Sequence, residues 1–202
     1  MKILIIGGAG TIGKKVSEHF SKKHEIVIAG RNSGEITVDI SNSKSIETMF
    51  ESVSNLDAVV CIAGEAKWAP FDSLTEKDYY IGLKNKLMGQ VNIVRLGHKY
   101  LNTGGSFTLT TGILADHPVM LTSSAALVNG AIHSFVKAVS LELTNKIRIN
   151  VVSPGLVEDA VKKYGTYFPG HNPIPMKKVI NGYVKSVEGK GTGEIIRMYD
   201  NC

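Results

Sequence analysis

A glycine-rich segment near the amino terminus has the residue types and spacing of a phosphate-binding turn. The segment Gly7-Gly8-Ala9-Gly10-Thr11-Ile12-Gly13 follows an apolar run at 3–6, and Ile12, Val16 and Phe20 then recur at helical spacing. Glycines permit a tight turn and a close approach to a pyrophosphate, and the free N–H groups of the new helix favour negative charge. The segment predicts a dinucleotide site, although a strand-to-helix turn that holds no ligand would have the same pattern.

The end of the second predicted strand, at 25–29, bears on which dinucleotide would bind. An acidic side chain there would accept hydrogen bonds from the adenosine ribose, whereas an arginine accommodates a 2′-phosphate. This chain continues with Gly30, Arg31 and Asn32 and has no acid at Ala29, Gly30 or Arg31. Because a guanidinium matches phosphate geometry, the turn favours NADP over NAD. A solvated arginine in a turn is the alternative.

The periodicity of the remaining chain predicts strands that alternate with helices. Beyond strands 3–6 and 25–29 and a helix over 12–20, strands are expected at 35–40, 56–62, 106–110, 147–151 and 193–199, and helices at 41–53, 75–100, 123–144 and 176–187. We expect the helix at 75–100 to break near Gly82, Ser123 or Ser124 to cap the helix at 123–144, and Asp39 either to cap the helix at 41–53 or to face an adenine. The pattern predicts one α/β domain over residues 1–202, a doubly wound, mostly parallel seven-stranded sheet with helices on both faces.

Composition narrows the function classes. The 202 residues contain no apolar run near the roughly 18 residues of a membrane span, and the amino terminus enters a strand at once, which leaves no room for a signal peptide. Cys61 and Cys202 are expected to stay reduced, so the sequence predicts a cytoplasmic protein. The net charge of +5 is scattered rather than gathered, which argues against nucleic-acid binding. The six histidines show no metal-ligand spacing.

Several separated segments resemble the short-chain dehydrogenase/reductase family, and together they span nearly the whole chain. They are Gly7-x-x-Gly10-x-x-Gly13, Asp39-Ile40, Ala63-Gly64 in place of the family's Asn-Asn-Ala-Gly, and the segments 136–143, 148–155 and 193–197. The resemblance implies that Gly7, Gly10, Thr11, Ile12 and Gly13 hold the pyrophosphate, Arg31 the 2′-phosphate, Asp39 and Ile40 the adenine, Ala63 and Gly64 the adenosine ribose, and Pro154, Gly155 and Leu156 the nicotinamide. It also implies a homodimer or homotetramer formed through the helices at 75–100 and 123–144.

The catalytic residues depart from the family's pattern. Its members typically use a Tyr-x-x-x-Lys pair, in which the lysine lowers the pKa of a tyrosine that protonates a carbonyl oxygen. In this chain the resemblance places that tyrosine at Ala125 and that lysine at Asn129, and neither residue can do this chemistry. The family's serine falls near Thr110-Thr111, and its helix asparagine falls at Lys86, or one residue away at Asn85.

Two hypotheses follow from this mixture of retained and altered motifs. The first is an NADP-dependent oxidoreductase that acts on an unknown small carbonyl or alcohol, with Lys86 polarising the carbonyl and Thr111 assisting by a hydrogen bond. His117, His171, Tyr164 and Tyr167 are further candidates that the spacing does not distinguish, and a solvated lysine is the plain alternative for Lys86. The second is an NADP(H)-binding sensor without chemistry, since loss of the pair would lower the rate by roughly 10² to 10⁴. The oxidoreductase is favoured because the fold and cofactor motifs point to it.

Overall fold

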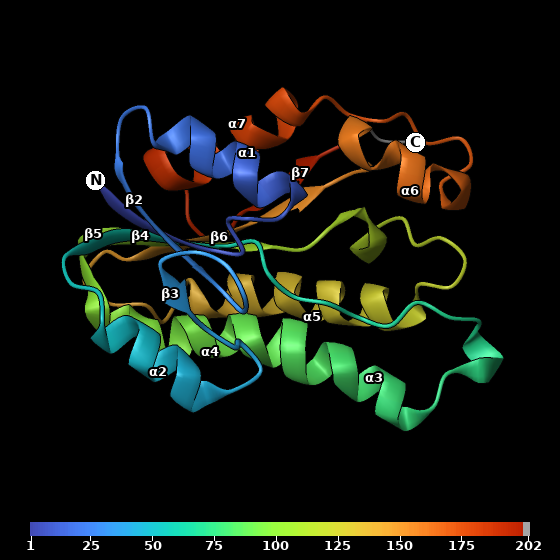
Figure 1. Cartoon of the computed structure of the whole chain (residues 1–202), viewed down its shortest axis with the longest axis horizontal. Helices are drawn as coiled ribbons and strands as arrows, with labels where there is room; N and C mark the ends of the chain where they lie inside the picture. Colours follow the sequence, from blue (N-terminus) through green and yellow to red (C-terminus); the bar gives the residue numbers. More distant parts are fainter. Residues whose placement is uncertain (200–202) are drawn as a thin grey trace.

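Seven parallel strands form one sheet in the computed structural model, which describes residues 1–199 (Figure 1). The strands are β1 (Lys2–Ile6), β2 (Glu25–Gly30), β3 (Ile36–Thr37), β4 (Leu56–Cys61), β5 (Leu101–Thr110), β6 (Arg148–Pro154) and β7 (Ile195–Met198). Their order is β3-β2-β1-β4-β5-β6-β7, and every neighbouring pair is parallel. The predicted doubly wound α/β fold is confirmed. Cys202 lies outside the described residues.

Helices cover both faces of the sheet (Figure 1). The helices α1 (Thr11–Phe20) and α7 (Met176–Glu188) pack on one face, and α2 (Ser43–Glu51), α4 (Met88–Gly97) and α5 (Ser123–Val139) pack on the other. Successive side chains of a strand point to opposite faces, so Ile3 and Ile5 join one core while Leu4 and Ile6 join the other. This is why the central strands are apolar throughout.

The predicted break near Gly82 is a widened helical turn. Helix α3 (Glu76–Gly82), which begins with a capping box between Thr75 and Asp78, continues without interruption into a π-helical turn at Leu83–Leu87 and then into α4. π-Helical turns inside α-helices occur frequently at functional sites. This turn carries Asn85 and Lys86, and each of them lines one of the two cavities described below.

The N-cap residues of α2 and α5 differ from those that the sequence suggested. Asp39 does not cap α2, because Asn42 Oδ1 accepts from the backbone N–H groups of Lys44 and Ser45. Helix α5 begins after Thr122 without a side-chain cap, so neither Ser123 nor Ser124 is its N-cap residue.

Helix α5 ends at Val139, five residues before the predicted end at 144. The chain then turns through two residues of positive φ, Asn145 and Lys146, before entering β6. The third strand is also shorter than the predicted 35–40, since only Ala29 and Gly30 of β2 pair with it. Within residues 1–199, no helix has both the length and the apolar character needed to cross a membrane.

Candidate cofactor and substrate site

Two adjoining cavities open at the carboxyl edge of the sheet. The first, the glycine-turn cavity, has a volume of about 420 Å³ and is lined by Ile6, Gly7, Ala9, Gly10, residues 30–33, Val38, Ile40, residues 63–65 and Asn85. The second, the lysine cavity, has a volume of about 650 Å³ and is lined by Ile12, residues 64–68, Lys86, residues 111–114, Leu121, Ala125, Asn129, residues 154–157, Ala160, Tyr164, Tyr167 and Phe168. Gly64 and Glu65 border both cavities.

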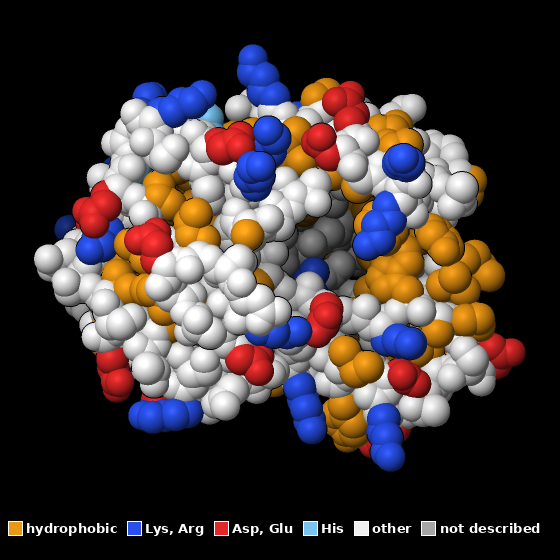
Figure 2. Space-filling model, viewed as in Figure 1, with side chains coloured by type: hydrophobic (Ala, Val, Ile, Leu, Met, Phe, Trp, Pro, Cys, Tyr) orange, Lys and Arg blue, Asp and Glu red, His pale blue; other side chains and the backbone are white. Residues whose placement is uncertain are grey.

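The position of these cavities follows from the strand order. From β1 the chain first moves outward through β2 and β3, and it then crosses back to continue through β4 on the other side. The loops after β1 and β4 therefore diverge and leave a crevice between them, which is where doubly wound sheets bind ligands. Figure 2 shows a hollow near the middle of this face, with hydrophobic side chains gathered along its right-hand side.

The glycine turn fits a pyrophosphate. Gly7 has a φ of +86°, and a Cβ atom on Gly13 would lie 2.1 Å from the Gly7 carbonyl oxygen, so the turn requires glycine at both positions. Helix α1 starts directly behind the turn, and no side chain of the described residues caps its first N–H groups. Its first turn carries no acidic residue. These N–H groups and the helix dipole are therefore available to an anion.

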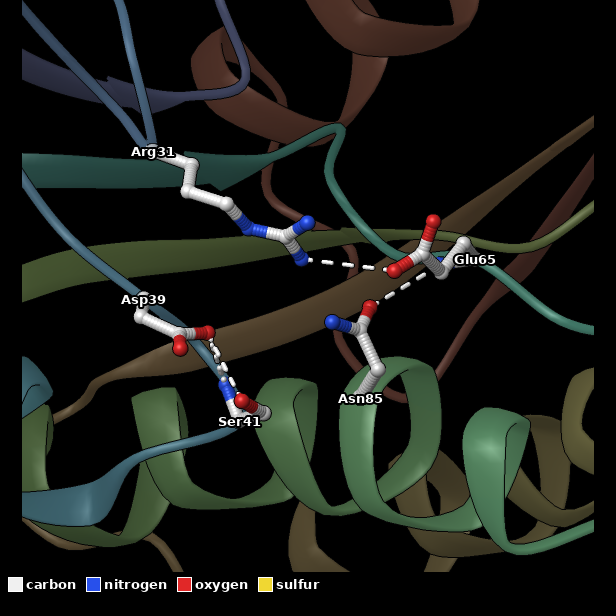
Figure 3. Close-up of polar contacts among 5 residues, drawn as sticks. All are labelled: Arg31, Asp39, Ser41, Glu65 and Asn85. Carbon is white, nitrogen blue, oxygen red and sulfur yellow. Dashed lines mark hydrogen bonds and ion pairs between the residues drawn. The ribbon is translucent and has the colours of Figure 1, made fainter. Parts of the chain in front are cut away.

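Arg31 and Glu65 face each other across the glycine-turn cavity (Figure 3). Arg31 Nη2 lies 3.4 Å from Glu65 Oε1, and the backbone N–H of Glu65 donates to Oδ1 of the buried Asn85 over 3.0 Å. The ion pair is solvent-exposed and so contributes little stability. The Glu65 carboxylate therefore pairs with the same guanidinium that, according to the sequence, would bind a 2′-phosphate.

Three residues of the predicted cofactor set line neither cavity: Thr11, Gly13 and Asp39. Gly13 instead lets α1 approach the turn. The Asp39 carboxylate accepts hydrogen bonds from the Ser41 hydroxyl and the Ser41 backbone, and these bonds lower the pKa of Asp39. The other predicted cofactor residues, Gly7, Gly10, Ile12, Arg31, Asn32, Ile40, Ala63, Gly64, Pro154, Gly155 and Leu156, all border one or both cavities.

Lys86 reaches the lysine cavity from the π-helical turn. Some of the side chain stays exposed, but the amine lies among buried groups, and this desolvation lowers the pKa of Lys86 to about 8. Gly64 has a φ of +131°, and a Cβ atom there would lie 2.7 Å from Lys86 Cγ, so the loop leaves the space that the lysine fills. Burial also raises the pKa of the Cys61 thiol to about 12, which keeps it neutral.

Thr111 is paired with a histidine that sequence reasoning did not connect to the site. Its Oγ1 lies 2.8 Å from His133 Nε2, and both residues are buried. Burial lowers the pKa of His133, while the nearby Asp116 carboxylate opposes this shift. His133 stands eight residues after Ala125 and four after Asn129 on α5, so the three share a helix face. This spacing could have predicted that His133 lies beside the candidate site.

Ala125 and Asn129 lie together in the lysine cavity and are buried. Asn129 Oδ1 has no hydrogen-bond partner among residues 1–199. Gly112 adjoins it, since a Cβ atom there would lie 3.6 Å from Asn129 Nδ2. Asn129 therefore borders the cavity with a buried amide oxygen that lacks a partner among the described residues.

The further candidates from the sequence divide into two groups. Tyr164 and Tyr167 line the lysine cavity, whereas His117 and His171 lie outside it with their ring centroids 6.5 Å apart. Among residues 1–199, no three His, Cys, Asp or Glu side chains gather as a metal site.

The chain matches known proteins over most of its length. A family model described as enoyl-(acyl carrier protein) reductase matches residues 8–179. Hydroxynaphthalene reductase-like protein Arp2 of Metarhizium guizhouense is 24% identical over 213 residues, which cover 90% of this chain and 79% of that protein.

Solved structures with the same fold cover nearly the whole chain. The protein lin1944 from Listeria innocua is 45% identical, with a TM-score of 0.97, over 98% of this chain and 100% of that chain. A small-chain dehydrogenase in complex with NADPH is 26% identical, with a TM-score of 0.86, over 98% of this chain and 95% of that chain. Because the family model covers most of the sequence and these structures share its whole fold, this protein belongs to the short-chain dehydrogenase/reductase family of oxidoreductases.

Proposed function

We propose that this protein is an NADP(H)-dependent oxidoreductase that interconverts a small carbonyl compound and its alcohol without a catalytic tyrosine. The observation that carries the proposal is the buried amine of Lys86 in a cavity that adjoins the glycine-turn cavity at Gly64 and Glu65. The NADPH complex of the 26% identical dehydrogenase supports the cofactor, and the reductase-like name of Arp2 supports the reaction class.

The cofactor would lie across both cavities. The α1 N-terminus would hold the pyrophosphate, Arg31 and Asn32 the 2′-phosphate, and Ile40 the adenine. Ala63 and Gly64 would border the adenosine ribose, and Pro154, Gly155 and Leu156 the nicotinamide. When bound, NADPH would supply the hydride at the carbonyl carbon.

Lys86 and Thr111 would act on the carbonyl oxygen. A protonated Lys86 can donate a hydrogen bond to that oxygen and then release a proton to the alkoxide, and a pKa of about 8 suits this transfer near neutral pH. The Thr111 hydroxyl, held by neutral His133, can donate a second hydrogen bond. Neither Ala125 nor Asn129 can supply a proton, so Lys86 would be the proton donor.

Turnover by the purified full-length chain tests this proposal. NADPH oxidation is followed over a panel of ketones and aldehydes for the native chain, Lys86→Met and Thr111→Val. We expect Lys86→Met to lower kcat/KM by roughly 10² or more, with a smaller loss for Thr111→Val. Lys84→Met is the matched control, because Lys84 lies on the same helical turn but is exposed. Reductive turnover of the native chain should fall above about pH 8, where Lys86 loses its proton.

A sensor without chemistry is the second candidate, and Ala125 and Asn129 in the lysine cavity favour it. A sensor would bind NADPH, seen as a rise in the melting temperature, and would turn over no member of the panel. Failure of NADPH, NADP⁺, NADH and NAD⁺ to shift the melting temperature would contradict both candidates.

We also propose that the chain forms a homodimer or homotetramer in the cytoplasm. Exposed apolar side chains on α3, α4 and α5, namely Tyr80, Ile81, Met88 and Leu127, support association through these helices. The neutral, buried Cys61 fits a reducing compartment.

A further inference from the structure

We propose that the lysine cavity selects a flat aromatic substrate that carries a hydroxyl group in addition to the oxygen contacted by Lys86. The proposal rests on the oxidoreductase function above and specifies its substrate class. It is carried by an aromatic wall, defined here as Trp68, Tyr164, Tyr167 and Phe168, and by the unsatisfied amide of Asn129.

The aromatic wall comes from two segments far apart in the chain. Trp68 lies in the loop after β4, and its ring centroid is 5.5 Å from that of Tyr164, 5.8 Å from that of Tyr167 and 6.5 Å from that of Phe168. The ring planes meet at 41°, 81° and 54°, so the rings contact one another at edges and tilted faces rather than in a closed stack. An aromatic ligand can add a further edge-to-face or offset contact to such a cluster.

The remaining apolar lining favours an apolar ligand over a polar one. Ile113, Leu114 and Leu156 are buried and border the same cavity. Since the nicotinamide half of the cofactor would also occupy this cavity of about 650 Å³, the substrate must be small. A protonated Lys86 disfavours a cationic ligand and favours an oxygen with partial negative charge.

Asn129 supplies the second polar contact. It is 3% exposed, borders the cavity, and its Oδ1 lacks a partner among the described residues. A buried carbonyl oxygen without a partner costs free energy, and a ligand group that satisfies it gains that energy back. The oxygen itself is buried, so a rotation of the Asn129 side chain would bring the amide to the ligand. A hydroxyl can both donate to and accept from an amide, so it fits either orientation of that side chain.

Calorimetric binding of three ketones to the full-length chain saturated with NADP⁺ tests the proposal. The oxidised cofactor prevents reduction, so the measurement reports binding alone. Acetophenone should bind roughly threefold to tenfold more tightly than cyclohexyl methyl ketone, which has the same carbon skeleton without the flat ring. 4′-Hydroxyacetophenone should bind about threefold to tenfold more tightly again.

Variants assign each preference to its side chain. Trp68→Leu should remove the preference for the aromatic ketone, and Trp68→Phe should restore most of it. Asn129→Leu should remove only the hydroxyl preference, and Asn129→Ala provides a second test should the leucine variant fail to fold. Phe71→Leu is the aromatic control, because Phe71 is 77% exposed and lies outside the cavity lining. Trp68 is the only tryptophan of the chain, so quenching of its fluorescence reports occupation of this site.

The outcomes separate this proposal from the proposed function. Equal affinities for the three ketones, or preferences that persist in Trp68→Leu and Asn129→Leu, would overturn the substrate class. Turnover of aliphatic ketones with NADPH would leave the oxidoreductase standing in that case. Selective binding of 4′-hydroxyacetophenone without turnover of any ketone would support the ligand class and contradict the oxidoreductase.

Discussion

The buried amine of Lys86 has a stability cost that can be measured. The pKa of Lys86 is about 8 in the folded protein and 10.5 in an unperturbed lysine. Below pH 8 both states bind the proton, so the full cost of burying the ammonium is present. Between pH 8 and 10.5 only the unfolded chain binds it, and the free energy of unfolding of the native chain rises with pH across this window.

Lys86→Met should therefore stabilise the protein at neutral pH. We expect its free energy of unfolding to exceed that of the native chain by about 1–3 kcal/mol at pH 7, and by clearly less at pH 10. Urea unfolding followed by tryptophan fluorescence at both pH values measures this, with Lys84→Met as the exposed control. A destabilised Lys86→Met variant, or the same difference at both pH values, would show that the amine is not held in an unfavourable environment.

Glu65 and Arg31 together should set the preference between NADPH and NADH. The Glu65 carboxylate pairs with the guanidinium that would bind a 2′-phosphate, so it competes with that group. Glu65→Gln should tighten NADPH binding severalfold and leave NADH binding nearly unchanged. The loop should keep its position, since the hydrogen bond from the residue 65 backbone N–H to Asn85 Oδ1 remains. Arg31→Ala should weaken NADPH binding by roughly tenfold with little effect on NADH. Equal changes for both dinucleotides would contradict this assignment.

Two glycines test how tightly the helices on one face of the sheet pack against each other. A Cβ atom on Gly97, at the end of α4, would lie 2.4 Å from Phe50 Cζ of α2, whereas one on Gly130, within α5, would meet nothing within 4 Å. Gly97→Ala should lower the free energy of unfolding by about 1–3 kcal/mol through overpacking. Gly130→Ala should raise it by about 0.5–1 kcal/mol, because alanine is the better helix former. Thermal and urea unfolding of the pair measure both effects, and a stabilised Gly97→Ala would contradict the close contact with Phe50.

Local patterns of the sequence were enough to predict the elements and their order. The glycine turn, the apolar strands and the amphipathic helices are each encoded within a few residues, and parallel pairing follows from their alternation. The N-cap residue of α2 depends on competing hydrogen bonds, which the spacing does not reveal. Asn42 accepts from the backbone N–H groups of Lys44 and Ser45, while the Asp39 carboxylate accepts from Ser41.

The candidate site was less accessible from sequence, because its chemistry depends on contacts between distant segments. The π-helical turn that buries Lys86 forms where α3 meets α4, and nothing in the spacing distinguishes it from a break at Gly82. The contact between Thr111 and His133 joins the end of β5 to α5 across 22 residues. Trp68 and Tyr164 meet only because the loops after β4 and β6 lie at the same sheet edge.

At the scale of the whole molecule, the exposed apolar side chains of α3, α4 and α5 should be buried by a second copy of the chain. Ile81 and Leu127 are 42% and 48% exposed on neighbouring helices, and a symmetric dimer places the same patch on both sides of an interface. The double variant Ile81→Glu/Leu127→Glu should place like charges in that interface, so light scattering should report a dimer or tetramer for the native chain and a smaller species for the variant. Leu141→Glu is the control, because Leu141 is 88% exposed beyond the end of α5 and should not alter the mass. A monomeric native chain would contradict the assembly. Dissociation by Leu141→Glu alone would place the interface elsewhere.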